Sequence, residues 1–220
     1  MIEATYIDHM GSDLSVVNAA RVSFGKSHTE FDVVRDTKLI NYLAKHKHIS
    51  PFGHAFASFH VKAPIFVARQ LVKHKFLRWN EVSRRYVDDE PEFYVPDVWR
   101  GRSADKKQGS SDTTVDFLRM QGFSEQSVHD GTVKHQMHSL DLYRDMLTAG
   151  VAPEQARMIL PQSTMTEFYW SGSLDAFASM CVLRLKGDTQ YETRVVAQQI
   201  DKVMSDLFPV SWEALVHDEA

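Results

Sequence analysis

The chain has 220 residues, of which 43% are hydrophobic, and its 25 Lys and Arg against 29 Asp and Glu give a formal net charge of −4. This balance argues against a general nucleic-acid binder, which usually carries an excess of basic residues. No apolar run reaches the roughly 20 residues that span a bilayer, and the N-terminal residues lack the basic and apolar regions of a signal peptide. One cysteine, Cys181, excludes an internal disulfide, so we expect a cytoplasmic protein without a membrane partner.

The first third of the chain predicts two strands and three helices. Residues 2–7 are typical of a short strand, and Ser12 is suited to cap the helix that follows. Residues 32–46 predict a second helix. Residues 55–63 alternate with a period of two, which predicts a strand. One side holds Ala55, Ala57, Phe59 and Val61, and the other holds Phe56, Ser58, His60 and Lys62. Pro64 is suited to be the first residue of a helix that extends to about residue 74.

The rest of the chain is mainly helical by its pattern. Residues 100–113 lack apolar side chains and predict a mobile loop or lid. Residues 133–149 predict a helix that ends at Gly150 and whose apolar face, directed to the core, holds Val133, Met137, Leu140, Tyr143 and Leu147. Further helices are expected from residue 153 to 159, from Ser171 or Ser173 to about 185, and over residues 189–207. The order of elements indicates a mixed α/β fold with few strands.

Residues 73–86, with the sequence KHKFLRWNEVSRRY, hold the densest cluster of positive charge. Its cations surround a single carboxylate, Glu81, and are Lys73, His74, Lys75, Arg78, Arg84 and Arg85. Cations mixed with directional hydrogen-bonding groups suit an anionic ligand that is read for its shape, such as a nucleotide. A solvated basic helix end or a nucleic-acid patch is the alternative that this spacing leaves open.

Two histidine clusters are weaker candidates for a functional site. His135, His138 and Asp141 share one face of a predicted helix. Because the sequence has no second cluster of soft metal ligands, a polar helix face is a better interpretation of these residues than a metal site. His46, His48 and His54 lie near a turn, where they could contact a ligand ring or a phosphate, or be ordinary loop residues.

Three further side chains sit among apolar neighbours. Cys181 has helical spacing from other apolar residues, which indicates a buried thiol more than a nucleophile. Arg157 and Arg184 each need a partner anion in such surroundings. That anion is either a ligand or an internal carboxylate from Glu154, Glu167 or Glu192.

Four segments taken together resemble the flavin-dependent thymidylate synthases: HISPFGHAFASFHVKAPIFVARQ, NEVSRRY, FYVP and ARMILPQSTMTEFYW. Their order and spacing match from AARVSF at residues 19–24 to the final helix. The family signature is an Arg-His-Arg triplet, a serine three residues later, and then Asn-Glu, Ser and Arg-Tyr. The last part is present here as Asn80, Glu81, Ser83, Arg85 and Tyr86.

The resemblance implies that residues 1–220 form a single α/β (α+β) domain, with a small mixed sheet and several packed helices. It implies methylation of dUMP to dTMP, with 5,10-methylenetetrahydrofolate as the carbon donor and FAD, reduced by NADPH, as the source of hydride. It also implies a homotetramer with active sites at subunit interfaces. A cysteine adduct of the uracil is not needed in this chemistry, in agreement with the core placement expected for Cys181.

The resemblance assigns cofactor-binding positions by residue. The flavin positions are His48, Ser50, Lys73, His74, Lys75, Glu81, Ser173, Leu174, Asp175 and Ser179. The last four begin a predicted helix, whose N-terminus suits polar contacts.

The nucleotide positions implied by the resemblance are Gln70, Leu71, Val72, Lys73, Glu81, Val82, Ser83, Arg84, Arg85, Arg157 and Arg184. Two of them have catalytic roles. Ser83, with Arg85, would hold the phosphate. Arg184 would favour ionised or polarised uracil through its positive charge, which is electrostatic catalysis.

The chain departs from the family pattern at several of these positions. Lys73 and Lys75 replace the two arginines of the triplet, which keeps the charge but loses the planar fork. Arg78 stands where a serine is usual, and we hypothesise that it supplies the lost guanidinium. Asp188 replaces a histidine, and Ser173 and Ser179 stand where asparagines are common.

Two other functions remain open from the sequence. A related flavoenzyme that hydroxymethylates a pyrimidine deoxynucleotide would also transfer one carbon from folate. An inactive homologue that binds nucleotides or RNA through the basic cluster would show strongly salt-dependent binding and no turnover.

Overall fold

The computed structural model describes residues 1–87, 89–104, 109–118 and 126–217. At its centre is a four-stranded sheet with the order β1-β2-β8-β3, in which every neighbouring pair is antiparallel. The strands are β1 (Glu3–Met10), β2 (Phe56–Pro64), β8 (Met165–Ser173) and β3 (Leu77–Glu81). The predicted α/β class is confirmed, but the expectation of a mixed sheet was wrong, because each strand runs opposite to its neighbour.

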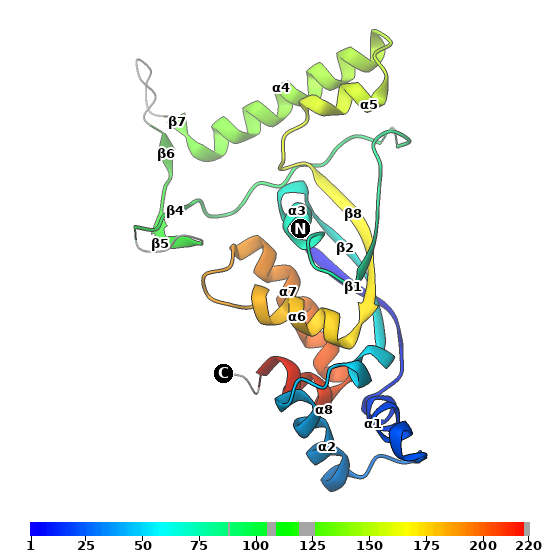
Figure 1. Cartoon of the computed structure of the whole chain (residues 1–220). Coiled ribbons are helices and arrows are strands. Elements are labelled where there is room, and N and C mark those ends of the chain that lie inside the picture. The colour runs from blue at the N-terminus through cyan, green and yellow to red at the C-terminus, as the bar shows by residue number, and fades with distance from the viewer. Residues whose placement is uncertain (88, 105–108, 119–125, 218–220) are drawn as a thin grey trace.

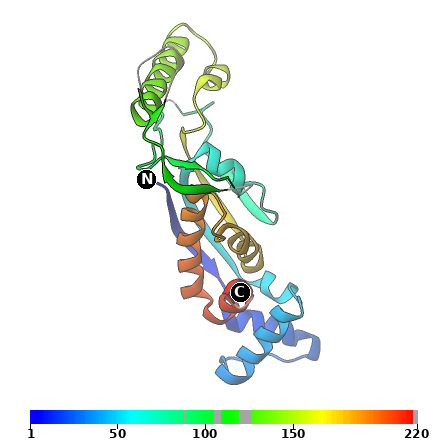
Figure 2. The same cartoon turned by 90° about the vertical axis from the view of Figure 1, so that its left-hand side faces the viewer.

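Helices pack around this sheet and extend the molecule in both directions along it (Figures 1 and 2). Helices α6 (Leu174–Arg184) and α7 (Tyr191–Leu207) cover one face of the sheet (Figure 1). At one end lie α1 (Asp13–Arg21), α2 (Val33–Lys45) and α8 (Pro209–Trp212), and beyond the other end lie α4 (Val128–Thr148) and α5 (Pro153–Ala156). Helix α3 (Ile65–Leu71) follows β2 directly. Within the described residues, no helix is long and apolar enough to cross a membrane.

The remaining elements are short. Two small hairpins are formed by β4 (Arg100–Arg102) with β5 (Ser110–Thr114), and by β6 (Phe117–Leu118) with β7 (Gln126–Ser127). The 3₁₀ turns are Val22–Phe24, Ser50–His54 and Arg157–Ile159, and Glu213–His217 forms a π-helical turn.

The core lies between the sheet and the helices that cover it. As the alternation predicts, Ala57, Phe59 and Val61 of β2 are buried. Phe177 of α6 contacts Phe59 and Trp170 edge-on, with ring centroids 5.3 and 5.5 Å apart. Aromatic pairs in this geometry stabilise a core beyond the area that they bury.

Strand β3 approaches β8 closely, and the sequence provides for this at Gly172. A Cβ atom there would lie 2.4 Å from Leu77 Cδ2 and 3.0 Å from the carbonyl oxygen of Phe76. Phe76 itself has a left-handed backbone, with φ of 65°. The chain thereby reverses after α3, so that Leu77 pairs with Gly172.

This reversal corrects two sequence-based expectations. Helix α3 ends at Leu71 rather than near residue 74, because the chain must turn to bring β3 alongside β8. Pro64 closes β2 and caps α3 instead of being its first helical residue. Strands β3 and β8 were not predicted, since neither segment has a clean two-residue alternation.

Two further expectations were wrong in detail. Residues 100–113 include the β4–β5 hairpin, in which backbone pairing of Arg100 with Thr114 supplies the order that apolar side chains do not. Residues 105–108 of the predicted loop lie outside the described residues. Helix α4 buries Gln136 and Ser139 beside Leu140, while Met137, expected in the core, is 48% exposed. Gln136 is buried because its Nε2 donates to Ser163 Oγ and to the carbonyl of Tyr94.

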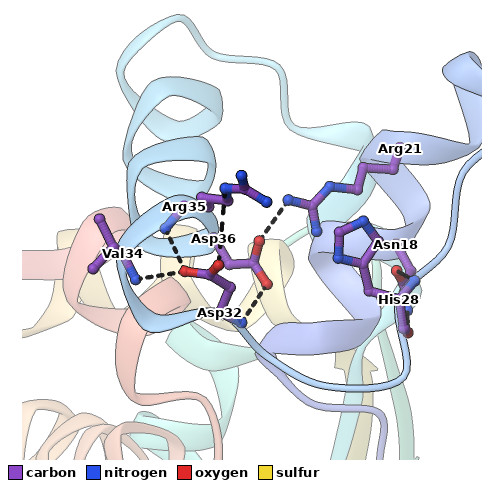
Figure 3. Close-up of polar contacts among 7 residues, drawn as sticks. All are labelled: Asn18, Arg21, His28, Asp32, Val34, Arg35 and Asp36. Atoms are coloured by element: carbon purple, nitrogen blue, oxygen red, sulfur yellow. Dashed lines mark hydrogen bonds and ion pairs between the residues drawn. The ribbon is translucent and has the colours of Figure 1, made fainter.

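A polar network joins α1 to α2 (Figure 3). Asp36 is fully buried and accepts hydrogen bonds from Arg21 Nη2 at 2.6 Å and from the backbone N–H of Asp32 at 2.9 Å. Asp32 in turn caps α2 by accepting from the N–H groups of Val34 and Arg35. Both carboxylates therefore fix the start of α2.

We expect Asp36→Ala to destabilise the fold by about 3–5 kcal/mol, because Arg21 would keep a mostly buried charge without its partner. Urea unfolding followed by circular dichroism measures this change. Arg35→Ala is the matched control: its ion pair with Asp32 is exposed and 3.9 Å long, so the loss should stay within about 1 kcal/mol. Equal losses for the two variants would contradict the importance of the buried pair.

Candidate active site

The basic residues 73–75 line a cavity of about 600 Å³, which we name the triplet cavity. Its walls come from the end of α2 and the residues after it, the turn after α3, most of α6 and the π-helical turn. The polar side chains that line it are Lys47, Lys73, His74, Lys75, Asp175 and Ser179. Apolar walls are supplied by residues such as Ile49, Val182 and Leu215. The cavity thus combines three ammonium groups with an apolar surface.

Asp175 gives this cavity an unused hydrogen-bond acceptor. It lies in the first turn of α6, and its Oδ1 is buried without a hydrogen-bond partner in the described structure. Buried carboxylate oxygens are usually satisfied, so an unpartnered one beside a cavity is suited to accept from a bound ligand.

Arg184, in the last turn of α6, is paired with a histidine rather than with an acid. Its Nε donates to His74 Nε2 at 3.0 Å, and its Nη2 lies 3.5 Å from the backbone oxygen of Gln70. Burial, followed by the charge of Arg184, lowers the pKa of His74 to about 4, so the imidazole is neutral at neutral pH. Within the described residues no carboxylate pairs with Arg184, so its charge next to His74 is not compensated by an acid there.

Gln70, at the end of α3, is held by residues of α7 and of the turn before it. Its Nε2 donates to Gln190 Oε1, and its Oε1 accepts from Thr193 Oγ1 at 3.3 Å. Leu71 and Val72, which follow it, differ in exposure: Leu71 is fully buried and Val72 is 48% exposed. Leu71 therefore presents no surface to a ligand in this structure.

A second cavity of about 390 Å³ lies beyond the far end of β3, and we name it the β3-end cavity. Four predicted nucleotide residues line it, namely Glu81, Val82, Arg84 and Arg157. Glu81 accepts hydrogen bonds from Thr166 Oγ1 at 2.8 Å and from Trp79 Nε1 at 3.1 Å. Arg157 is exposed and lines this cavity, and its Nε donates to the backbone oxygen of Glu154 at 3.3 Å. Among the described residues no carboxylate pairs with it, which suits it to an anion.

Ser83 and Arg85 lie in the segment that leaves β3. Arg85 Nε donates to Ser83 Oγ at 3.1 Å, and its guanidinium lies over the ring of Tyr86, 5.0 Å from the centroid. Arg85 and Tyr86 are exposed, and Tyr86 is 78% accessible. A hydroxyl and a guanidinium in contact form a small site that suits a phosphate.

The predicted site residues that line a cavity fall into two separate groups, one in each cavity. Residues 73–75 precede β3 and Glu81 ends it, and a five-residue strand is about 17 Å long. Lys73 and Glu81, both predicted to contact the flavin and the nucleotide, are therefore at opposite ends of one strand. Within one chain, the predicted residues do not meet around a single ligand position.

The other predicted positions lie near the triplet cavity or in the core. His48 and Ser50 are exposed after α2, and the His48 ring is 6.0 Å from that of Tyr42. Ser173 caps α6 by its position and is buried, as is Leu174. Arg78 lies on β3 opposite Ser171, and it is absent from the linings of both cavities.

Burial confirms one interpretation made from the sequence, that of Cys181. Cys181 is fully buried, and burial raises the pKa of its thiol, as expected of a core residue. His135 and His138 are exposed on α4, and the described residues contain no group of three potential metal ligands. Lys47, which lines the triplet cavity, was not predicted, although it lies between the candidate histidines His46 and His48.

Comparisons with known proteins identify the family of this chain. The family described as thymidylate synthase complementing protein matches residues 5–210. A flavin-dependent thymidylate synthase of Thermus thermophilus is 38% identical over 94% of this chain and 73% of its own length. That of Kosmotoga olearia is 39% identical over 96% of this chain and 88% of its own.

The chain belongs to the flavin-dependent thymidylate synthase family. A solved structure supports this at the level of the fold: a UMP/dUMP methylase, PolB, from Streptomyces cacaoi, bound with 5-Br dUMP. It is 30% identical, has a TM-score of 0.82, and covers 97% of this chain and 94% of its own.

Because His74 is neutral in the folded chain, the stability of the fold should depend on pH. The unfolded chain binds a proton at His74 near pH 6.5 but the folded chain only near pH 4, so folding loses stability as the pH falls through this window. We expect His74→Gln, which keeps an acceptor for Arg184, to remove up to about 1.4 kcal/mol per pH unit of that dependence.

The measurement is urea unfolding of the ligand-free protein at several values between pH 4 and 7. His138→Gln makes the same change at an exposed position of α4 and is the control. Parallel stability curves for wild type and His74→Gln would show that His74 is not held neutral.

Proposed function

We propose that this protein converts dUMP to dTMP, with 5,10-methylenetetrahydrofolate as the carbon donor and FAD, reduced by NADPH, as the hydride source. The observation that carries the proposal is the pairing of Arg184 with a neutral His74 at the edge of a cavity suited to a flavin. The named activities of the relatives support the same chemistry.

The triplet cavity fits FAD by its donor set. Lys47, Lys73 and Lys75 are suited to the diphosphate, and the apolar wall suits the ring system. The unpartnered Oδ1 of Asp175 is suited to accept from a hydroxyl or ring N–H of the cofactor. When bound, reduced FAD supplies the hydride, and the chain's own residues bind and orient the partners.

The polar groups around Gln70 and the β3-end segment suit dUMP. Arg85 and Ser83 would hold the phosphate, and Arg157 would add a second guanidinium to the anionic end. Arg184 would lie at the base, where its charge favours the negative charge that develops on uracil oxygen during attack. The bromo-dUMP and bromo-UMP complexes of the solved relative support a pyrimidine monophosphate as the ligand class.

A cysteine nucleophile has no place in this proposal. Cys181 is fully buried between α6 and α7, where its Sγ lies 3.8 Å from the carbonyl oxygen of Ala197. Its raised pKa also keeps it in the unreactive thiol form. Activation of the uracil therefore rests on charge and hydrogen bonds.

We also propose a homotetramer in which each active site combines two chains. The predicted contacts to each ligand are divided between cavities at the two ends of β3. In an oligomer, a second chain would supply the contacts that lie too far away within one chain. Exposed aromatic side chains flank both ends, with Phe76 81% and Tyr86 78% accessible. Aromatic residues are enriched at protein–protein interfaces relative to the rest of the surface.

The proposed function predicts the mass of the nucleotide product. Protein with FAD, NADPH and methylenetetrahydrofolate should convert dUMP to a nucleotide heavier by one methylene group, as measured by mass spectrometry. A product heavier by a further oxygen would establish hydroxymethylation instead. A flavin spectrum that does not respond to dUMP, together with salt-dependent RNA binding, would support the inactive binding protein.

Arg184→Gln should lower kcat about 10²–10³-fold, because it removes the positive charge at the developing anion. Steady-state kinetics with dUMP measure the change, and flavin absorbance checks that FAD remains bound. Arg144→Gln removes a half-exposed guanidinium from α4 and is the control. A kcat within about threefold of wild type would contradict the electrostatic role of Arg184.

The assembly is tested by mass in solution. Light scattering after size exclusion should give four times the chain mass of 25.2 kDa, about 100 kDa. A monomer that turns over dUMP would contradict shared active sites.

A further inference from the structure

A continuous chain of side-chain hydrogen bonds runs from the β4–β5 hairpin to Gln70. Arg100 Nη2 donates to Glu192 Oε1 at 2.5 Å, and Gln190 Nε2 donates to Glu192 Oε2 at 3.2 Å. Gln190 Oε1 then accepts from Gln70 Nε2, and Gln70 Oε1 accepts from Thr193 Oγ1. The chain connects a hairpin with a residue proposed to bind the nucleotide.

The direction of every bond in this chain follows from its charged end. A guanidinium only donates hydrogen bonds, and a carboxylate only accepts them. Because Glu192 accepts from Gln190, the amide oxygen of Gln190 must point toward Gln70. The amide nitrogen of Gln70 must then face Gln190, and its oxygen must face Thr193. One buried carboxylate thereby fixes the orientation of two amides that could otherwise rotate by 180°.

Arg100 holds the carboxylate in place. The side chain of Glu192 is 5% exposed, and that of Arg100 is 26% exposed. Arg100 Nε also donates to Ser110 Oγ at 3.0 Å, and its guanidinium lies over the ring of Tyr191, 4.6 Å from the centroid. These contacts fix the guanidinium on three sides, and a paired, desolvated Arg–Glu contact is more rigid than an exposed one.

The hairpin that carries Arg100 is itself seated on the connection between α6 and α7. Gly109, with φ of +85°, lies so close to this connection that a Cβ atom would be 2.7 Å from the carbonyl oxygen of Asp188. The hairpin and the start of α7 are therefore packed together on either side of the Arg100–Glu192 pair.

We propose that Glu192 and Arg100 are positioning residues that determine the selectivity for uracil over cytosine, by fixing which way the amide of Gln70 faces. This inference rests on the proposed function, in which Gln70 contacts the pyrimidine. After its bonds to Gln190 and Thr193, Gln70 keeps one N–H hydrogen and one oxygen lone pair, at positions that the chain fixes.

The chemistry of the two bases explains why the orientation matters. Uracil presents an N–H donor at N3 and an acceptor at O4, whereas cytosine presents an acceptor at N3 and a donor at N4. A base held in one position by its phosphate and sugar therefore matches only one orientation of the Gln70 amide. With a fixed amide, cytosine would leave buried polar groups unpaired, and the cost of these unpaired groups rejects it. An amide that rotates freely would pair with either base and would therefore accept both.

The test replaces the carboxylate by an amide of the same shape. Glu192→Gln can both donate and accept, so it removes the fixed direction of the chain while keeping its volume. The FAD-loaded tetramer or lower oligomer, as isolated, is titrated with dUMP and with dCMP, and the change in flavin absorbance gives both Kd values. We expect the ratio of the dCMP Kd to the dUMP Kd to fall at least about fivefold, the factor for one net hydrogen bond.

Two further variants separate selectivity from folding. Arg100→Gln combined with Glu192→Gln leaves no unpaired buried charge, and it decides the result if Glu192→Gln does not fold. Glu30→Gln makes the same chemical change at an exposed position and should keep the wild-type ratio. A structural defect would weaken the binding of both nucleotides equally and leave the ratio of their Kd values unchanged.

Each outcome bears on one claim. A wild-type flavin spectrum that responds to neither nucleotide contradicts the proposed function itself. A wild type that responds to dUMP, together with an unchanged ratio in the folded variants, overturns only the role of Glu192 and Arg100. A wild type that binds dUMP and dCMP equally well also overturns that role.

Discussion

The packing of aromatic side chains between β8 and α6 is the constraint on which the rest of the structure depends. Phe168 and Trp170 face inward from β8, and Phe168 stacks on Trp79 of β3 with ring centroids 3.6 Å apart. Phe177 joins the same cluster from α6. The cluster therefore fixes β3 and α6 relative to each other. Because β3 separates the two cavities and α6 carries Asp175 and Arg184, apolar packing sets the geometry of the polar site.

The electrostatics of the site follow from this packing. Partial burial keeps His74 neutral, so that it accepts a hydrogen bond from Arg184 instead of repelling it. Burial of Glu192 against Arg100 gives a second fixed group, which orients amides toward Gln70. In the first place the charged Arg184 is held by a neutral histidine, and in the second the charged Glu192 is held by its ion pair with Arg100. The remaining cations, on the surface of the triplet cavity, stay available for an anionic ligand.

The sequence predicted what depends on local pattern and missed what depends on contacts between distant residues. The alternation in β2 and the burial of Cys181 could be recognised because burial repeats at the spacing of a strand or a helix. Strands β3 and β8 could not, since β3 lies in a basic segment and is held by its pairing with β8. Likewise, Arg100 and Glu192 are 92 residues apart, and neither stands out alone. The motif residues were found by resemblance, but their division between two cavities appears only in the fold.

The burial of Cys181 has a practical consequence for the study of this protein. A thiol reagent can reach that single sulfur only when α6 and α7 separate, since the native side chain has no accessible surface. The rate of alkylation under native conditions would thus report how often this part of the core opens. Because the protein has no other cysteine, the signal comes from one known position without mutagenesis. Ligands that bind between α6 and the turn after α3 would slow the labelling in proportion to their occupancy.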